Sequence, residues 1–194
     1  MKILVASGNK EKVKEIQAIL DKWDIITLND IKNTVEVIEN GKTFEENAKK
    51  KAKEIYEQTL IPCLADDSGI CIKQYHGWPG VKTARFLGEE KASNQYARQR
   101  NEFILAKMEG IEKAKRQVDY ITVIAYYDGV EFKIGTGILS GFIATKCRGE
   151  NGFGFDEIFE LEDGRTLAEL EKAEKNVISS RKKALEEIKR QINR

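Results

Sequence analysis

A β-rich segment runs from Gln117 to Tyr127 and is followed at once by Asp128-Gly129. The segment is rich in Val, Ile and Tyr, which favour strands. Asp-Gly is typical of the two-residue turn of a β-hairpin, so residues 130–134 are predicted to return as the partner strand. A further strand is expected at 137–144. Antiparallel hairpins therefore dominate the second half of the chain.

The first half alternates short apolar segments with amphipathic helices. A strand is predicted at Ile3–Ala6, and a helix from about Glu11 to Lys22. A second helix begins at Thr43, where Thr43 and Glu46 fit a capping box. The other predicted elements are extended segments at 25–28, 35–38 and 70–73, a helix at about 93–109 and a C-terminal helix capped by Ser179. Helices alternating with strands, then hairpins, predict an α/β protein with a mixed sheet.

An apolar run from Leu60 to Ala65 ends in Asp66-Asp67-Ser68-Gly69. The run is typical of a buried strand, and two adjacent carboxylates at its exit would repel each other. We expect a positive charge to compensate them, and Mg²⁺ prefers carboxylate oxygens. Ser68-Gly69 is expected to turn tightly. A surface turn is the alternative, because Asp, Ser and Gly are common turn residues.

Composition excludes several classes of protein. The 194 residues suggest one domain, or one domain with two lobes. With 33 basic and 32 acidic residues, charge gives no argument for binding nucleic acid or an anionic membrane. The single histidine, His76, argues against Ser-His-Asp and multi-histidine metal chemistry. The three cysteines form no CxxC pair and are expected to be reduced. The apolar N-terminal run is too short for a signal peptide, so we expect a cytoplasmic protein.

Two segments could bind anions. Ser7-Gly8-Asn9 connects a strand to a helix, and backbone N–H groups at a helix N-terminus favour phosphate. Lys10 and Lys12 add positive charge, although the segment is not a P-loop. An ordinary capped helix with solvated lysines is the alternative. Near the C-terminus, Lys175, Ser180 and Arg181 could converge on a ligand, or they could form a solvated basic helix start.

The loop from Arg148 to Asp156 contains three glycines, which permit a close backbone approach. Phe153 and Phe155 could stack on a planar base, and Asp156 could accept hydrogen bonds from its edge. The alternative is a glycine turn whose phenylalanines cap the core.

In this order, the motifs closely resemble those of the inosine triphosphate pyrophosphatase (ITPase) family. They are Ser-Gly-Asn-x-x-Lys from Ser7, Thr-Phe-x-Glu-Asn-Ala-x-x-Lys-Ala from Thr43, Asp-Asp-Ser-Gly from Asp66, Gly-x-Pro-Gly-Val-x-x-Ala-Arg-Phe from Gly77, Gly-Phe-Gly-Phe-Asp from Gly152, and Glu-Lys-Asn-x-x-Ser-x-Arg from Glu174. The resemblance extends from Ile3 to Leu185.

The resemblance implies a single two-lobed domain over residues 1–194, with a long curved mixed sheet flanked by helices and a central active-site cleft. It implies Mg²⁺-dependent hydrolysis of non-standard purine nucleoside triphosphates (ITP, dITP and XTP) to the monophosphate and pyrophosphate. It also implies a homodimer. Asp67 matches the catalytic base and metal ligand. Glu39 matches a second metal-side carboxylate, for which Glu36 is the rival.

The resemblance also assigns the substrate contacts. The triphosphate would be held by Ser7, Gly8, Asn9, Lys10, Glu11, Lys12 and Lys51, and the nucleoside by Ser68, Phe153, Gly154, Phe155, Asp156, Lys175, Ser180 and Arg181.

The chain departs from the family pattern at three positions. Phe155 stands where the family usually has Tyr, and Glu157 where it usually has Pro. Ser180 replaces a histidine that helps to read the base in the family. A pyrophosphatase for pyrimidine or other modified nucleotides is therefore one alternative function. A nucleotide-binding module without catalysis is another, and an RNA-binding module would conflict with the balanced charge.

Overall fold

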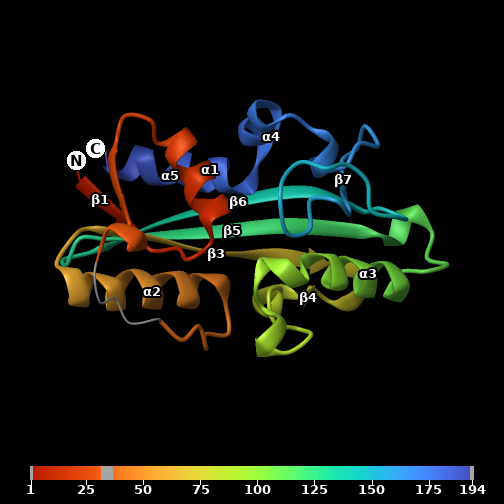
Figure 1. The fold of residues 1–194 in the computed structure, drawn as a ribbon, viewed down its shortest axis with the longest axis horizontal. Coiled ribbons are helices and arrows are strands. Elements are labelled where there is room, and N and C mark those ends of the chain that lie inside the picture. Colours follow the sequence, from red (N-terminus) through yellow and green to blue (C-terminus); the bar gives the residue numbers. More distant parts are fainter. Residues whose placement is uncertain (1, 32–36, 193–194) are drawn as a thin grey trace. The chain divides into compact units, whose positions relative to one another are not determined.

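A computed structural model describes residues 2–31 and 37–192 of the chain. The protein is a mixed α/β structure in which helices flank a sheet with the strand order β2-β1-β3-β5-β6-β7, and β4 pairs with β3 (Figure 1). The chain divides into two compact units. The first unit comprises residues 1–68, 122–137 and 179–194, and the second comprises residues 69–121 and 138–178.

Three strands contribute to both units, namely β3 (Cys63–Ile72), β5 (Gln117–Tyr127) and β6 (Phe132–Ile143). The first unit also contains β1 (Lys2–Val5), α1 (Lys10–Ile19), β2 (Asp24–Thr27), α2 (Phe44–Thr59) and α5 (Ser180–Ile192). The second also contains β4 (Trp78–Pro79), α3 (Ala97–Lys107), β7 (Phe159–Glu160) and α4 (Lys172–Ile178).

In the first unit, β1 pairs in parallel with both β2 and β3, and Leu4 lies opposite Cys63. Helices α1 and α5 cover one face of these strands, and α2 covers the other (Figure 1). In the second unit, β6 and β7 pair antiparallel. The sheet is mixed, as the pattern of the sequence predicts.

Local sequence explains where the helices begin. The Thr43 hydroxyl accepts a hydrogen bond from the Glu46 N–H at 3.1 Å and so caps α2. The Glu46 carboxylate accepts from the Lys42 N–H, one residue earlier than a capping box requires, so that part of the prediction is wrong. Ser179 caps α5 by accepting from the Lys182 N–H at 3.1 Å, as predicted.

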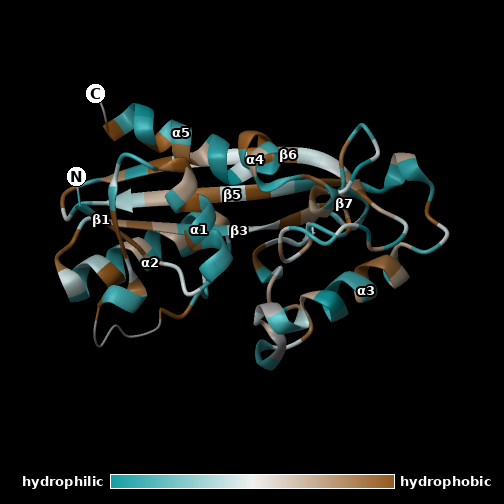
Figure 2. Ribbon diagram, turned by 45° about the horizontal axis from the view of Figure 1, so that its top comes forward, coloured by the Kyte–Doolittle hydropathy of each residue, from teal (hydrophilic) through white to brown (hydrophobic). Residues whose placement is uncertain are grey.

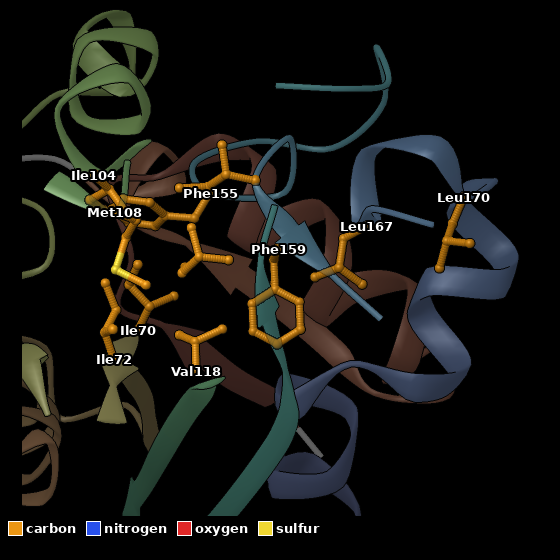
Figure 3. Packing of buried hydrophobic residues seen from close by; sticks show 11 residues of the cluster. Ile70, Ile72, Ile104, Met108, Val118, Phe155, Phe159, Leu167 and Leu170 are labelled. Carbon is orange, nitrogen blue, oxygen red and sulfur yellow. The ribbon is translucent and has the colours of Figure 1, made fainter. Parts of the chain in front are cut away.

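Each unit has its own hydrophobic core. In the first unit, the amphipathic helices α1 and α5 show hydrophilic and hydrophobic residues along the same ribbon (Figure 2). Their apolar side chains pack on the strands in a cluster of Ile3, Val5, Ile16, Leu20, Leu64, Ile124, Tyr126, Ala184, Leu185 and Ile188. In the second unit, Phe155, Phe159 and Met108 pack with isoleucines of β3 (Figure 3).

Two predicted breaks are absent. Strand β3 continues through Ser68-Gly69, where we expected a turn. The Thr83 hydroxyl accepts from the Ile70 N–H at 3.0 Å, and a Cβ at Gly69 would lie only 2.7 Å from Thr83, so this stretch is extended and closely packed. Strand β6 likewise runs unbroken from Phe132 to Ile143, where we expected two strands.

Other boundaries also shift. Helix α1 ends at Ile19, three residues before the predicted end, and α3 begins at Ala97 after a short 3₁₀ turn. Helix α4 was not predicted. The expected extended segment at 35–38 lies partly outside the described residues, and residues 37–38 form no strand. None of the helices in the described ranges is long and apolar enough to cross a membrane.

Candidate active site

Asp66 and Asp67 lie in the middle of β3, where we expected them at a strand exit. Successive side chains of a strand point to opposite faces. Lys12 of α1 forms an ion pair with Asp66 at 3.0 Å, which places Asp66 on the face covered by α1. Asn47 of α2 donates to Asp67 at 2.9 Å, which places Asp67 on the other face. The two carboxylates therefore have different direct partners, although the charges of Lys12 and Lys51 act on both.

Asp66 is the centre of a buried ion-pair network and is 1% exposed. Its Oδ2 atom lies 3.0 Å from Lys12 Nζ and 3.1 Å from a guanidinium nitrogen of Arg181. The same guanidinium nitrogen donates to the Ser68 hydroxyl at 3.2 Å. Burial opposes ionisation, but Lys12 and Arg181 outweigh it and hold the pKa of Asp66 well below its usual range. Protein cations thus supply the positive charge that we expected a metal to supply for Asp66.

Asp67 is in the opposite electrostatic situation. Its carboxylate accepts hydrogen bonds from Asn47 Nδ2 and from the Ser68 N–H, both at 2.9 Å. Burial, followed by repulsion from the nearby Glu39 carboxylate, raises the pKa of Asp67 to about 6. A carboxylate with such a pKa can accept a proton near neutral pH, which is the property of a general base.

Lys51 connects Glu39 to β3. Its ammonium group forms an ion pair with Glu39 and donates to the Asp66 carbonyl oxygen at 2.9 Å. Burial alone would lower the pKa of Lys51, but Glu39 and Asp66 outweigh that effect and raise it. Glu39 is thus close to the predicted site, whereas its rival Glu36 lies outside the described residues.

The turn before α1 is organised by Asn9. Its side chain accepts from the N–H groups of Glu11 and Lys12, and its own N–H donates to the Ser7 hydroxyl. Two of the N–H groups that we expected to face a phosphate are therefore bonded within the turn. A Cβ on Gly8 would have no atom within 4 Å, so the space beside Gly8 is open to a ligand.

Lys10 and Glu11 are peripheral to the network. Lys10 is exposed, and Glu11 forms an ion pair with Lys14 at 2.7 Å. Of the predicted residues on α1, Lys12 is the one that the structure brings to Asp66.

Helix α5 contributes two buried side chains. Arg181 is 4% exposed and forms a second ion pair with Glu15 of α1. Ser180 is 5% exposed, and its hydroxyl lies 2.8 Å from the Thr122 hydroxyl of β5. The predicted contact between Ser180 and a bound base stays a prediction, and the hydroxyl has a protein partner in Thr122.

In the second unit, Asp156 organises the glycine-rich loop. Asp156 is 2% exposed, and its carboxylate accepts from the Phe153 N–H at 2.7 Å and from Lys175 at 2.6 Å. The Lys175 ammonium also lies 4.5 Å from the centre of the half-buried Phe153 ring. Asp156 thus shapes the loop, and its predicted role in accepting hydrogen bonds from a base edge stays a prediction.

The two phenylalanines of this loop differ in exposure. Phe155 is 3% exposed and packs in the core of the second unit, so its ring is not free to stack on a base. Its side chain points into the cluster of Figure 3. Phe153 is the aromatic residue of the pair that retains an accessible surface.

The model of the Ham1 family matches residues 3–191. The chain belongs to the Ham1 family. A dITP/XTP pyrophosphatase of Lactiplantibacillus plantarum is 40% identical over 191 residues, which cover 96% of this chain and 92% of the relative. That of Bacillus subtilis is 40% identical over 189 residues, covering 95% and 93% of the two chains.

Solved Ham1 structures have the same fold. A HAM1 protein from Coxiella burnetii superposes with a TM-score of 0.87 at 34% identity, covering 100% of this chain and 98% of that one. The Ham1 protein of Staphylococcus aureus gives a TM-score of 0.85 at 32% identity, with the same coverage. The fold class and the family predicted from the ordered motifs are therefore confirmed.

Two residues of this Ham1 chain reach the site without having been predicted there. Asn47 is fully buried and bridges the Gly41 N–H and Asp67. Its position four residues before Lys51, on the same helical face, was the available signal. Glu15 lies three residues after Lys12 on α1, so the same helical spacing could have indicated it.

Proposed function

We propose that this Ham1 protein is a dITP/XTP pyrophosphatase, which hydrolyses ITP, dITP and XTP to the nucleoside monophosphate and pyrophosphate. The observation that carries the proposal is that Glu39 raises the pKa of Asp67, while Lys51 forms an ion pair with Glu39 and Lys12 with the adjacent Asp66. Phosphoryl chemistry requires groups of both kinds, since a base must activate water and cations must stabilise the phosphate charge. The names of relatives at about 40% identity support the same activity.

The carboxylates of the first unit fit a bound Mg²⁺. Glu39 repels Asp67, which is the electrostatic situation that a divalent cation relieves. No cluster of three or more His, Cys, Asp or Glu that could hold a metal occurs in residues 2–31 and 37–192. Mg²⁺ is usually held by one or two carboxylates together with water and substrate phosphates. We therefore propose Asp67 and Glu39 as its protein ligands, and the bound ion would polarise the phosphate and lower the pKa of the attacking water.

The site residues of the first unit then have the following roles. Asp67 accepts the proton of the water that attacks the α-phosphorus, and pyrophosphate leaves. Lys12 and Lys51 neutralise the triphosphate charge. Ion pairs with Asp66 and Glu39, respectively, hold the two lysines in place before the substrate binds. Gly8 admits a phosphate group beside the turn that precedes α1.

Residues of the second unit would contact the nucleoside. The Phe153 ring offers a face for stacking, and Gly154 permits a close approach of the backbone. Lys175, which lies over the ring, would remain available to a polar group of the substrate. In the first unit, Ser68 and Arg181 are also proposed to contact the nucleoside. They would do so together, because the Arg181 guanidinium group donates to the Ser68 hydroxyl.

A nucleotide panel tests the reaction. Purified protein with Mg²⁺ is incubated with ITP, dITP, XTP, the four ordinary ribonucleoside triphosphates and dTTP, and pyrophosphate release is measured. The first three should react fastest. Faster hydrolysis of a pyrimidine nucleotide would replace the proposed substrate class, and tight ITP binding without product would indicate a binding module.

Asp67→Asn tests the mechanism. We expect turnover to fall by about 10²–10⁴-fold, because the amide cannot accept the proton. Asp21→Asn removes the same charge at an exposed position and serves as the matched control. Thermal unfolding verifies that both variants are folded. Wild-type turnover in folded Asp67→Asn would remove the residue from the mechanism.

We further propose that the protein assembles as a homodimer. Sedimentation velocity across a range of protein concentrations tests the assembly. A species with the 22.1 kDa mass of one chain at every concentration would contradict it.

A further inference from the structure

The loop of residues 149–156 has a backbone that few side chains could adopt. Gly149, Gly152 and Gly154 have φ angles of +82°, +81° and +65°, a region that is readily accessible to glycine. Glycine also has the largest conformational freedom in a flexible chain, so this loop loses much entropy when it becomes ordered. Contacts from outside the loop must therefore maintain its shape.

Helix α3 provides such a contact through Asn101, which is 1% exposed. The Asn101 Nδ2 group donates to the Gly154 carbonyl oxygen at 3.0 Å and lies 3.4 Å from Glu157 Oε2. Both neighbours are acceptors, so the orientation of the amide is determined: its NH₂ group must face the loop. Arg98, one helical turn earlier, also donates to Glu157 at 3.3 Å.

Gly154 follows the residue whose ring is proposed to stack on the base. The Phe153 N–H is held by Asp156, and the carbonyl group of the next residue is held by Asn101. These two bonds restrain the backbone on both sides of the peptide that joins Phe153 to Gly154. The orientation of the Phe153 ring therefore depends on a side chain of α3 that lies outside the loop.

We propose that Asn101 is a positioning residue for nucleoside recognition, which holds the Gly154 carbonyl and so presents the Phe153 ring to a purine base. The inference rests on the proposed function, because it assumes that the loop contacts the nucleoside. Its physical basis is preorganisation: a loop that is already ordered loses less entropy when the ligand binds.

Asn101→Asp is the most direct test, because it keeps the shape of the side chain and replaces the donor with an acceptor. The new carboxylate would face the Gly154 carbonyl and the Glu157 carboxylate, so the loop should be released. We expect the dissociation constant for inosine monophosphate to rise about tenfold, the change that corresponds to losing one hydrogen bond. The dissociation constant for pyrophosphate, which probes the lysines of the first unit, should stay within about twofold of the wild-type value. Calorimetric titration measures both.

Hydrogen exchange gives a readout that does not depend on any ligand. The Phe153 amide should exchange about tenfold faster in Asn101→Asp than in the wild type, while amides of the first unit keep their protection. Loss of protection throughout the protein would mean that Asn101 supports the fold as a whole, and would overturn the inference.

A second variant covers the case in which Asn101→Asp does not fold. Glu157 is 34% exposed, so Glu157→Ala should fold normally while removing the acceptor shared by Asn101 and Arg98. Its effect on inosine monophosphate binding should have the same direction, at about threefold. Glu102→Gln is the matched control on the same helix, since it removes an exposed ion pair with Arg98 and leaves the loop contacts in place.

The outcomes separate this inference from the proposed reaction. Weaker nucleotide binding with unchanged pyrophosphate binding supports the role of Asn101, whether or not dITP is hydrolysed. Faster loop exchange with unchanged nucleotide affinity overturns it, as does a wild-type protein that binds pyrophosphate but not inosine monophosphate. A wild-type protein that binds both ligands and hydrolyses no nucleotide refutes the reaction alone.

Discussion

Two adjacent aspartates with the same chemistry have acquired different properties. Asp66 is surrounded by Lys12 and Arg181, which stabilise its ionised form, whereas Asp67 is buried beside Glu39 and is more easily protonated. The alternation of side chains along β3 contributes to the difference, because it directs Asp66 to Lys12 and Arg181 and directs Asp67 to Asn47. Asp66 is thereby suited to holding Lys12 and Arg181 in place, and Asp67 is suited to accepting a proton.

The raised pKa of Asp67 makes a prediction about pH. In metal-free protein, a carbon-13 titration of its carboxyl group should give a midpoint near 6, and Glu39→Gln should lower it because the repulsion is removed. The folded-state pKa lies above the unfolded value of about 3.9. The proton is therefore bound more tightly in the folded state, and the stabilisation it provides is complete below about pH 4 and is lost as the pH rises through 6. An unshifted midpoint in Glu39→Gln would show that burial alone causes the shift.

Arg181 makes a prediction about stability. Arg181→Ala leaves Glu15 and Asp66 buried without their shared cation. The free energy of unfolding should fall by about 3–5 kcal/mol, as for other broken buried ion pairs. Urea denaturation at neutral pH measures the change.

Lys182→Ala on the same helix is the control for Arg181→Ala. It removes an ion pair with Glu186 on the surface of α5, and such pairs contribute at most about 1 kcal/mol. Equal losses in the two variants would contradict the buried network as the source of the stability.

At the level of elements, β3 and β6 are both longer than the local sequence patterns predict. In β3, Asp-Asp-Ser-Gly is typical of a turn, yet helices on both faces provide partners for its polar side chains, and the strand continues. In β6, Gly135 and Gly137 interrupt the apolar pattern. The backbone of α5 lies directly against both glycines and leaves no room for a Cβ atom. These glycines therefore permit close packing of α5 and do not mark the end of the strand.

Gly137→Ala tests this close packing. A Cβ at Gly137 would overlap the Ser180 carbonyl oxygen and lie 2.8 Å from the Ala184 nitrogen, and neither backbone atom can move without moving α5. We expect a loss of about 1–3 kcal/mol or more in the free energy of unfolding. Chemical denaturation measures it.

Gly8→Ala is the matched substitution. Its Cβ would have no neighbour within 4 Å, so stability should be unchanged while dITP hydrolysis decreases. Normal activity in Gly8→Ala would argue against phosphate binding at this turn.

At the scale of the whole molecule, two units each bury a separate apolar cluster, and β3, β5 and β6 contribute to both. The proposed metal ligands are two carboxylates, and the described residues contain no cluster of three or more candidate ligands. Neither cluster includes Asp67 or Glu39, so we expect the cores to form without help from an ion.

If the metal ion serves the reaction and not the folding of the cores, a chelator should affect activity alone. Removing divalent ions with EDTA should abolish dITP hydrolysis, and added Mg²⁺ should restore it, while the thermal unfolding midpoint in EDTA stays within about 2 °C of its original value. A large decrease in the midpoint would show that the ion is part of the folded structure.

The amino-acid sequence alone was sufficient to predict the α/β class, the starts of α2 and α5, the strand of residues 117–127 and the family. These features depend on periodicity, on caps and on the order of short motifs, all of which are local properties of the chain. Tertiary structure decided that Asp66 pairs with Lys12 and Arg181, that Ser180 and Phe155 are buried, and that Asn101 donates to the Gly154 carbonyl oxygen. Each of these depends on a partner distant in sequence, and a side chain's burial and charge environment are set by such partners.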